Sequence, residues 1–227
     1  MATDAPMVTA TSAQILTLSQ WLSPAYPVGA FAYSHGLEAA ADQGWLRDGS
    51  DLEAWLQEVL EHGAGRSDAL FLAAAWHANA AADLVAELAA IDATACAFAA
   101  SQERLLETRQ QGRSFGLVTE AIWGAQLAGL TYPVALGAAA AAEGLPLELT
   151  QVMYLQGFLS NLVAAGQRLL PVGQTQGQQI LQRLSCRLPA IADQTRDGDL
   201  SQLSATAFLA DIAAMKHETQ RSRIFRT

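Results

Sequence analysis

Apolar residues recur along most of this chain at the spacing of an α-helix, and the alternation typical of β-strands is nearly absent. Residues 50–63, SDLEAWLQEVLEHG, show the pattern most clearly. One helical face of this stretch collects Leu52, Trp55, Leu56, Val59 and Leu60. Ser50 and Glu53 have the spacing of a capping box, and Gly63 is placed to end the helix.

The same spacing predicts helices over most of the remaining chain. Their expected ranges are 12–22, 30–43, from Ser67 onward, 80–90, 93–110, 115–128, 134–142, 148–169, 175–196 and 205–218. Glycines and prolines, among them Gly112, lie between them as breaks. We therefore expect an all-α fold: a single-domain bundle of about ten helices over residues 12–218, with short connections marked by Gly and Pro. A flexible segment, residues 1–11, precedes it, and a mobile basic tail, residues 219–227, follows.

The charge balance argues against nucleic acid as a partner. The chain carries 22 acidic and 13 basic residues, a formal net charge of −9, whereas phosphate binding needs clustered Lys and Arg. Charged residues make up only 15% of the chain, which favours burial of surface against a partner or a second copy. Two uncharged runs, 121–142 and 149–167, reach the ~20 residues of a membrane span. Glycine, proline and amide residues interrupt them, so we expect buried helices and no membrane contact.

The cysteines and the first residues indicate the compartment. Cys96 and Cys186 form no paired motif, and we expect two buried thiols in a reducing environment. The opening residues, MATDAPMVTATS, lack both the positive start and the apolar core of a secretory signal. The sequence thus predicts a cytoplasmic protein.

Motifs for catalysis, nucleotide binding and metal binding are missing. No two of the four histidines have the spacing of three or four residues that converges on one ion. Neither GxxxxGK[ST] nor GxGxxG occurs. We therefore expect no enzyme, no cofactor and no metal site.

One motif matches a signature of catalytic serines. GRSFG, residues 112–116, fits the G-x-S-x-G nucleophile elbow, which requires a buried strand before it. The preceding residues are polar and helix-forming, with Glu103 and Glu107 placed to pair with Arg104 and Arg109. A helix–glycine–helix junction is the better account, and a hydrolase using Ser114 is the alternative.

Residues 23–38, SPAYPVGAFAYSHGLE, are unusual in composition for this chain. A helix from about Ala30 would place Tyr33 and Leu37 on an apolar face. Ser34, His35 and Glu38 would gather on the opposite, accessible face, as a partner surface or as ordinary residues of a first turn.

Residues 168–178, RLLPVGQTQGQ, bend at two glycines after a long helix. Gly173, Gln174 and Gln178 would lie on a loop rich in amide donors and acceptors, which suits recognition of another backbone. Ordinary capping of a helix connection is the alternative.

The C-terminal residues, MKHETQRSRIFRT, form a basic segment on an acidic body. Residues 1–220 hold 10 basic and 22 acidic residues and sum to −12, whereas the last seven add +3. Those charges are Arg221, Arg223 and Arg226, and they surround Ile224 and Phe225, which a free end would expose. Arginine and aromatic residues dominate binding hot spots, so docking on a partner is favoured over folding back.

At these stretches the chain resembles the urease accessory protein UreF family. The similar segments are residues 23–38, ETRQQGRSFG, RLLPVGQTQGQ and MKHETQRSRIFRT, in that order, and they span nearly the whole chain. Tyr26, Ala32 and Gln176 stand where the family often has leucine, serine and aspartate.

The resemblance implies an all-α homodimer that binds a second accessory protein, UreD (also called UreH). That complex recruits the GTPase UreG, and the assembly inserts nickel into apo-urease. It also implies a tail that orders on binding UreD, and a protein that is not itself a GTPase. We expect a non-catalytic scaffold whose partner-binding residues are Tyr33, Ser34, His35, Glu38, Gly173, Gln174, Gln178, His217, Glu218, Arg221, Arg223, Phe225 and Arg226. The alternative is a true GTPase activator that inserts Arg113, Arg221, Arg223 or Arg226 into UreG.

Overall fold

The computed structural model describes residues 10–125, 127 and 129–227, and these residues form helices and connections without a strand. The α-helices are α1 (Ser12–Trp21), α2 (Leu37–Asp42), α3 (Gly49–His62), α4 (Ala64–Ala78), α5 (Leu84–Phe98), α6 (Gln102–Trp123), α7 (Tyr132–Ala142), α8 (Leu147–Leu169), α9 (Gln174–Ser185), α10 (Leu188–Thr195) and α11 (Phe208–His217). Two short 3₁₀ turns, η1 (Ala30–Ala32) and η2 (Leu200–Gln202), complete them. The all-α fold predicted from the sequence is confirmed. The flexibility expected for residues 1–11 falls largely on residues 1–9, outside the described part.

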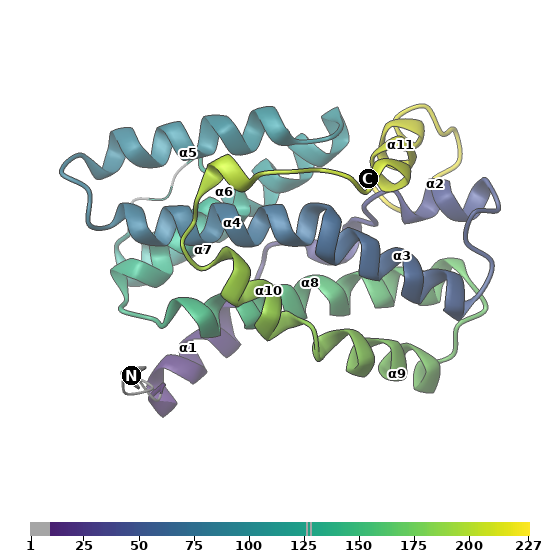
Figure 1. The fold of residues 1–227 in the computed structure, drawn as a ribbon, viewed down its shortest axis with the longest axis horizontal. Helices are drawn as coiled ribbons and strands as arrows, with labels where there is room; N and C mark the ends of the chain where they lie inside the picture. The colour runs from purple at the N-terminus through teal and green to yellow at the C-terminus, as the bar shows by residue number, and fades with distance from the viewer. Residues whose placement is uncertain (1–9, 126, 128) are drawn as a thin grey trace, which may run out of the picture.

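Helices α4 and α7 form the centre of the bundle. Every residue of α7 from Tyr132 to Ala140 is buried, and α7 packs along α4, which runs lengthwise through the molecule in Figure 1. A methyl group placed on Gly137 would lie 2.2 Å from the carbonyl oxygen of Leu72, so only glycine allows the two helices to approach this closely. Helix α5 lies along one side of this core, with α9 and α10 on the other (Figure 1).

Helix α6 runs without interruption through Gly112 and Gly116, so the predicted helix break there is wrong. A methyl group on Gly112 would lie 2.1 Å from the carbonyl oxygen of Leu130. The glycines therefore serve close packing against the segment before α7. Ser114 lies within the helix, which excludes the strand-to-helix turn of a nucleophile elbow.

The helix predicted over residues 30–43 is also wrong. The chain forms η1, leaves the helical conformation, and enters α2 only at Leu37. His35 and Gly36 both have positive φ, 54° and 78°, which turns the chain sharply between them. A methyl group on Gly36 would lie 2.6 Å from the backbone nitrogen of Ala214, because α11 packs directly on this turn.

Other differences between the predicted and the observed structure are smaller and local. The N-cap of α3 is Asp48, which accepts from the backbone nitrogens of Ser50 and Asp51, so the capping box predicted at Ser50 is not formed. The helix predicted over 175–196 is split into α9 and α10, with Pro189 in the first turn of α10. Cys186, expected to be buried, is exposed. In the described part of the chain, none of the helices combines the length and apolarity needed to cross a membrane.

Candidate functional site

The tail, residues 219–227, lies against the body of the protein close to α2 and α11 (Figure 1). Its backbone is bound mainly by the buried Glu38 at the start of α2. Glu38 Oε1 accepts from the N–H of Ile224 at 2.6 Å, and Oε2 accepts from the N–H of Phe225 at 2.8 Å. Hydrogen bonds to a charged acceptor are about twice as strong as neutral ones, so this carboxylate is the main anchor of the tail.

The end of the tail is held by the turn before α2. The backbone nitrogen of Ser34 donates to the main-chain oxygen of Thr227 at 2.8 Å, and the Ser34 hydroxyl donates to the same oxygen at 2.6 Å. One residue earlier, the N–H of Arg226 donates to the carbonyl oxygen of Ala32 at 2.8 Å. The unusual composition of residues 23–38 thus provides a binding site for the chain's own tail.

His217, fully buried at the end of α11, joins three helices. Its Nδ1 lies 2.6 Å from Glu103 Oε2 on α6, and its Nε2 lies 3.3 Å from Glu38 Oε2 on α2. Arg223 Nη1 donates to the other oxygen of Glu103 at 2.5 Å and Nη2 donates to the Glu218 carbonyl at 2.7 Å. Glu103 therefore connects α6 with both the last helix and the tail.

Phe225 is the apolar anchor of the tail, with 4% of its surface exposed. The Arg168 guanidinium lies over its ring, 4.2 Å from the centroid. Arg168 also donates to the carbonyl oxygen of Phe31 at 3.3 Å. The neighbouring residue Ile224 points the other way and is 60% exposed.

A second buried carboxylate, Glu107, lies deeper under the tail. The Thr227 hydroxyl donates to Glu107 Oε2 at 2.8 Å, Arg104 pairs with the same oxygen, and His35 Nε2 lies 2.7 Å from Oε1. Burial opposes ionisation, but Arg104 and His35 outweigh it and lower the pKa of Glu107 to about 2. Burial, aided by the charge of Arg104, also lowers the pKa of His35, so its neutral form is favoured at pH 7.

Asp68 on α4 lies beside this cluster, and its pKa is shifted in the opposite direction to that of Glu107. Burial raises the pKa of Asp68 to about 6, and Arg104 and the Tyr154 hydroxyl oppose that rise only in part. The hydroxyl of Tyr154 donates to Asp68 Oδ2 at 2.7 Å. The cluster therefore holds one carboxyl that is strongly ionised and one that titrates close to neutral pH.

The structure corrects the predicted accessible face of residues 34–38. Ser34, His35 and Glu38 are 0%, 8% and 6% exposed, because the left-handed turn at His35 directs them toward the tail and α6. Tyr33, expected on the apolar face of a helix, lies between η1 and α2 and is buried, and its hydroxyl donates to Gln110 Oε1 at 2.6 Å.

The structure also corrects the loop predicted at residues 173–178. Gly173 is the N-cap of α9, and Gln174 and Gln178 are exposed residues of that helix. Helix α9 packs on α3 and α8, apart from the tail contacts described above. The stretch is therefore the start of a helix and not a loop.

Sequence reasoning missed the acidic partners of the tail. Glu103 and Glu107 were assigned to ion pairs along their own helix, and Glu107 does pair with Arg104. Their contacts with His217, Arg223 and Thr227 join residues more than a hundred positions apart. The available signal was the spacing of Glu103, Glu107 and Gln111, which places three polar side chains on one face of α6.

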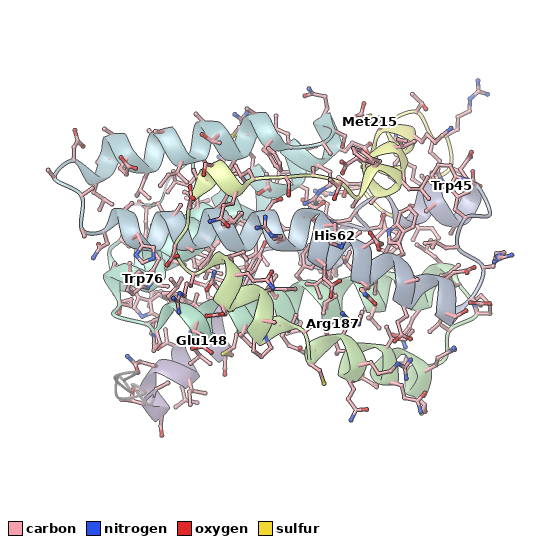
Figure 2. The ribbon with its side chains drawn as sticks, in the orientation of Figure 1. Trp45, His62, Trp76, Glu148, Arg187 and Met215 are labelled. Atoms are coloured by element: carbon pink, nitrogen blue, oxygen red, sulfur yellow. The ribbon has the colours of Figure 1, made fainter. Side chains whose placement is uncertain are left out.

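A different surface is apolar and exposed. Figure 2 labels Met215 on α11 and Trp45 just after α2, at the same end of the molecule. The exposed side of α11 carries Phe208, Leu209, Ile212 and Met215, which are 66%, 50%, 44% and 51% exposed. We call these four residues the α11 face. Ala213, Ala214 and His217 occupy the buried side of the same helix.

Comparison with known proteins gives consistent results. A family model described as UreF matches residues 46–185. The "Urease accessory protein UreF" of Ruegeria pomeroyi is 54% identical over 221 residues, which cover 97% of this chain and all of that protein. The protein of the same name from Roseobacter denitrificans is 49% identical over 212 residues, 93% of each chain. A third, from a Ruegeria species, is 54% identical over 217 residues.

Proposed function

The chain belongs to the UreF family of urease accessory proteins, which are non-catalytic factors of urease maturation, and we propose that it acts as a scaffold in that process. With UreD (UreH) it recruits the GTPase UreG for GTP-dependent insertion of nickel into apo-urease. The observation that best supports this role is the contact between Glu38 and the backbone of Ile224 and Phe225. It joins the two most distinctive stretches of the sequence into one surface.

The docked tail divides its residues between two roles. Phe225 and Arg223, together with His217, hold the tail on the body. Arg221, Ile224 and Arg226 are exposed, and arginine and large apolar side chains are typical of binding hot spots. We assign UreD to this exposed row, and Glu218, whose carboxylate accepts from the N–H of Gln102 at 2.7 Å, fixes where the row begins.

Removal of residues 218–227 tests this assignment. The shortened chain should lose co-purification with UreD while its helical circular dichroism is kept, because α11, the last helix found in the described residues, ends at His217. A finer test changes Ile224→Asp and Arg226→Glu together, and uses Arg196→Glu, an exposed arginine after α10, as the control. Undiminished UreD binding by the double variant would overturn the assignment.

The α11 face supports a homodimer. Phe208, Ile212 and Met215 follow the i, i+4, i+7 spacing, so they form one continuous apolar stripe along the exposed side of the helix. Large exposed apolar patches mark interaction surfaces in soluble proteins. A second copy of the chain, related by a two-fold axis, would cover the stripe with its own.

The polar face of α9 is proposed as a contact for UreG. Gln174 and Gln178 are exposed on this helix, and Gly173 caps it. Uncharged amides at such a surface contribute hydrogen bonds without the desolvation cost of full charges.

A GTPase activator remains a second candidate because several arginines are exposed without a carboxylate partner. Arg113, Arg221 and Arg226 make no ion pair within the described residues, whereas Arg223 is tied to Glu103. An arginine finger is worth about 10³–10⁵ in rate. Single-turnover GTP hydrolysis by UreG, at saturating complex, should fall by that factor if one of these arginines is replaced, and should not change for a scaffold.

Both cysteines support a reducing compartment. Cys96 and Cys186 are free thiols, and Cys186 is exposed. An exposed, unpaired thiol is typical of proteins that remain in the cytoplasm, where we place this chain.

A further inference from the structure

A cleft of about 540 Å³ opens between the turn at residues 27–33, α6, α8 and the tail. Arg113 on α6, Arg168 on α8 and Arg226 on the tail line it. Gln110 and Ser114 on α6 add an amide and a hydroxyl. No Asp or Glu belongs to its described lining, although the whole chain carries 22 acidic and only 13 basic residues.

The three arginines of this cleft also form no ion pair with an acidic side chain outside it, within the described residues. Most other arginines are paired, as in Arg183 with Glu53 and Arg187 with Glu61. Within the described residues, neither Arg113, Arg168 nor Arg226 has an acidic oxygen within 4.0 Å. Three like charges gathered without a counter-charge repel one another, and a bound anion would relieve that repulsion.

Parts of the cleft are already fixed in place. Arg168 is oriented by the Phe225 ring and by the Phe31 carbonyl. The backbone of Arg226 is bound by Ala32, and its side chain lies close to the Tyr33 hydroxyl. Since Tyr33 donates to Gln110 Oε1, the amide nitrogen of Gln110 is left as a donor. A preformed set of donors reduces the ordering cost of binding.

We propose that this cleft binds an oxyanion of the phosphate class. A single carboxylate carries one negative charge and two oxygens, too few to pair with three guanidinium groups. A phosphate brings about −1.5 to −2 charges and three or more acceptor oxygens, and arginine binds phosphate in a bidentate manner. The volume also exceeds what one phosphate needs, so a diphosphate or the phosphates of a nucleotide fit the same chemistry.

Anion binding in this cleft is coupled to the tail. Arg226 and Ile224 come from the tail, so the complete site exists only while the tail is docked. A ligand that binds only the docked form stabilises that form by mass action. Bound phosphate should therefore protect the tail arginines from trypsin.

Calorimetric titration of the full chain with inorganic pyrophosphate tests the proposal. Saturable binding with a dissociation constant below about 1 mM is expected at fixed ionic strength. Arg113→Gln should weaken it about tenfold or more, because one charge-assisted contact is lost, and Arg113→Lys should restore part of it. Arg113 has no intramolecular partner among the described residues, so neither variant should disturb the fold. Arg183→Gln, on α9, is the control for a general loss of positive charge and should bind as the wild type does.

Titrations with phosphate and GDP then identify the source of the anion. Tighter binding of GDP than of pyrophosphate points to a nucleotide, and equal binding points to the free anion. Absence of saturable pyrophosphate binding would overturn the proposal, as would equal weakening by Arg183→Gln. Binding of a poly-glutamate peptide without any of pyrophosphate would instead assign the cleft to an acidic protein segment, which also contradicts the proposal. Because these measurements use the chain alone, their failure leaves the UreD assignment untouched.

Discussion

Glu38 Oε2 accepts a hydrogen bond of 2.8 Å from the backbone nitrogen of Phe225, a residue 187 positions further along the chain. The same carboxylate binds Ile224 and contacts His217, so one buried charge determines where the tail lies. It also explains why a basic segment folds against an acidic body. The backbone is captured by Glu38, and the positive side chain of Arg223 is matched by Glu103.

Glu38→Gln should release the tail. An amide offers one neutral acceptor oxygen where the carboxylate offers two charged ones, so one tail N–H loses its acceptor and the other keeps only a neutral one, at a cost of about 1.5–3 kcal/mol. We expect faster trypsin cleavage at the tail arginines and faster hydrogen exchange at residues 224 and 225. Glu58→Gln, at an exposed position on α3, is the matched control and should leave both rates unchanged.

Substitutions of Phe225 and Ile224 should have sharply different effects on tail docking, although the two residues are adjacent. Phe225→Ala removes a buried ring that packs under Arg168, and such truncations cost about 3–5 kcal/mol when the whole fold depends on them. Because the tail can open by itself, we expect the loss to appear as undocking measured by hydrogen exchange. Ile224→Ala should change tail protection by less than about 0.5 kcal/mol but weaken UreD binding. Equal tail protection in the two variants would contradict the division of roles.

Two glycines offer a matched test of the packing in the core. Gly137→Ala places a methyl group 2.2 Å from the Leu72 carbonyl oxygen, and it should lower the free energy of unfolding by at least about 1–3 kcal/mol. Gly157→Ala, in α8, meets nothing closer than 4.0 Å and should raise the free energy of unfolding by about 0.5–1 kcal/mol. Urea denaturation measures both. The reverse order would show that α4 and α7 are further apart than described.

The raised pKa of Asp68 predicts how the free energy of unfolding depends on pH. Its folded-state pKa of about 6 lies above the ordinary value of 3.8, so its contribution to stability is complete below about pH 4 and is lost as pH rises through 6. Glu107, with a lowered pKa, acts in the opposite direction but only below about pH 4.5. Between pH 5 and 7 the Asp68→Asn variant should therefore gain about 1 kcal/mol of stability relative to wild type, as part of a total of about 3 kcal/mol that begins to develop below pH 4. A constant difference between the two unfolding energies would rule out a buried, titrating Asp68.

The α11 face can be tested by sedimentation. Ile212→Asp places a charge in the middle of the apolar stripe, and burying an unpaired charge is costly enough to dissociate a dimer. Val85→Asp alters an exposed apolar residue on α5, away from the α11 face, and should leave the mass unchanged. A wild-type monomer at all concentrations would contradict the homodimer.

Sequence patterns predicted the helices whose packing is regular, and failed where distant contacts decide the conformation. The helices expected at 148–169 and 205–218 match α8 and α11 within a few residues, because their apolar spacing is unbroken. The turn at His35 could not be predicted, since its left-handed backbone is enforced by the approach of α11 to Gly36. For the same reason a helical reading placed Glu38 on an exposed face.

The long separation between Glu38 and Phe225 has a consequence for biosynthesis. A chain emerging from the ribosome completes α2 and α6 well before its last ten residues leave the exit tunnel. Until then Glu38 and Glu107 lack the tail donors that satisfy them in the finished protein. The helical body can therefore fold first, held by the pairs of Glu107 with Arg104 and His35, and docking of the tail follows as a separate, later step.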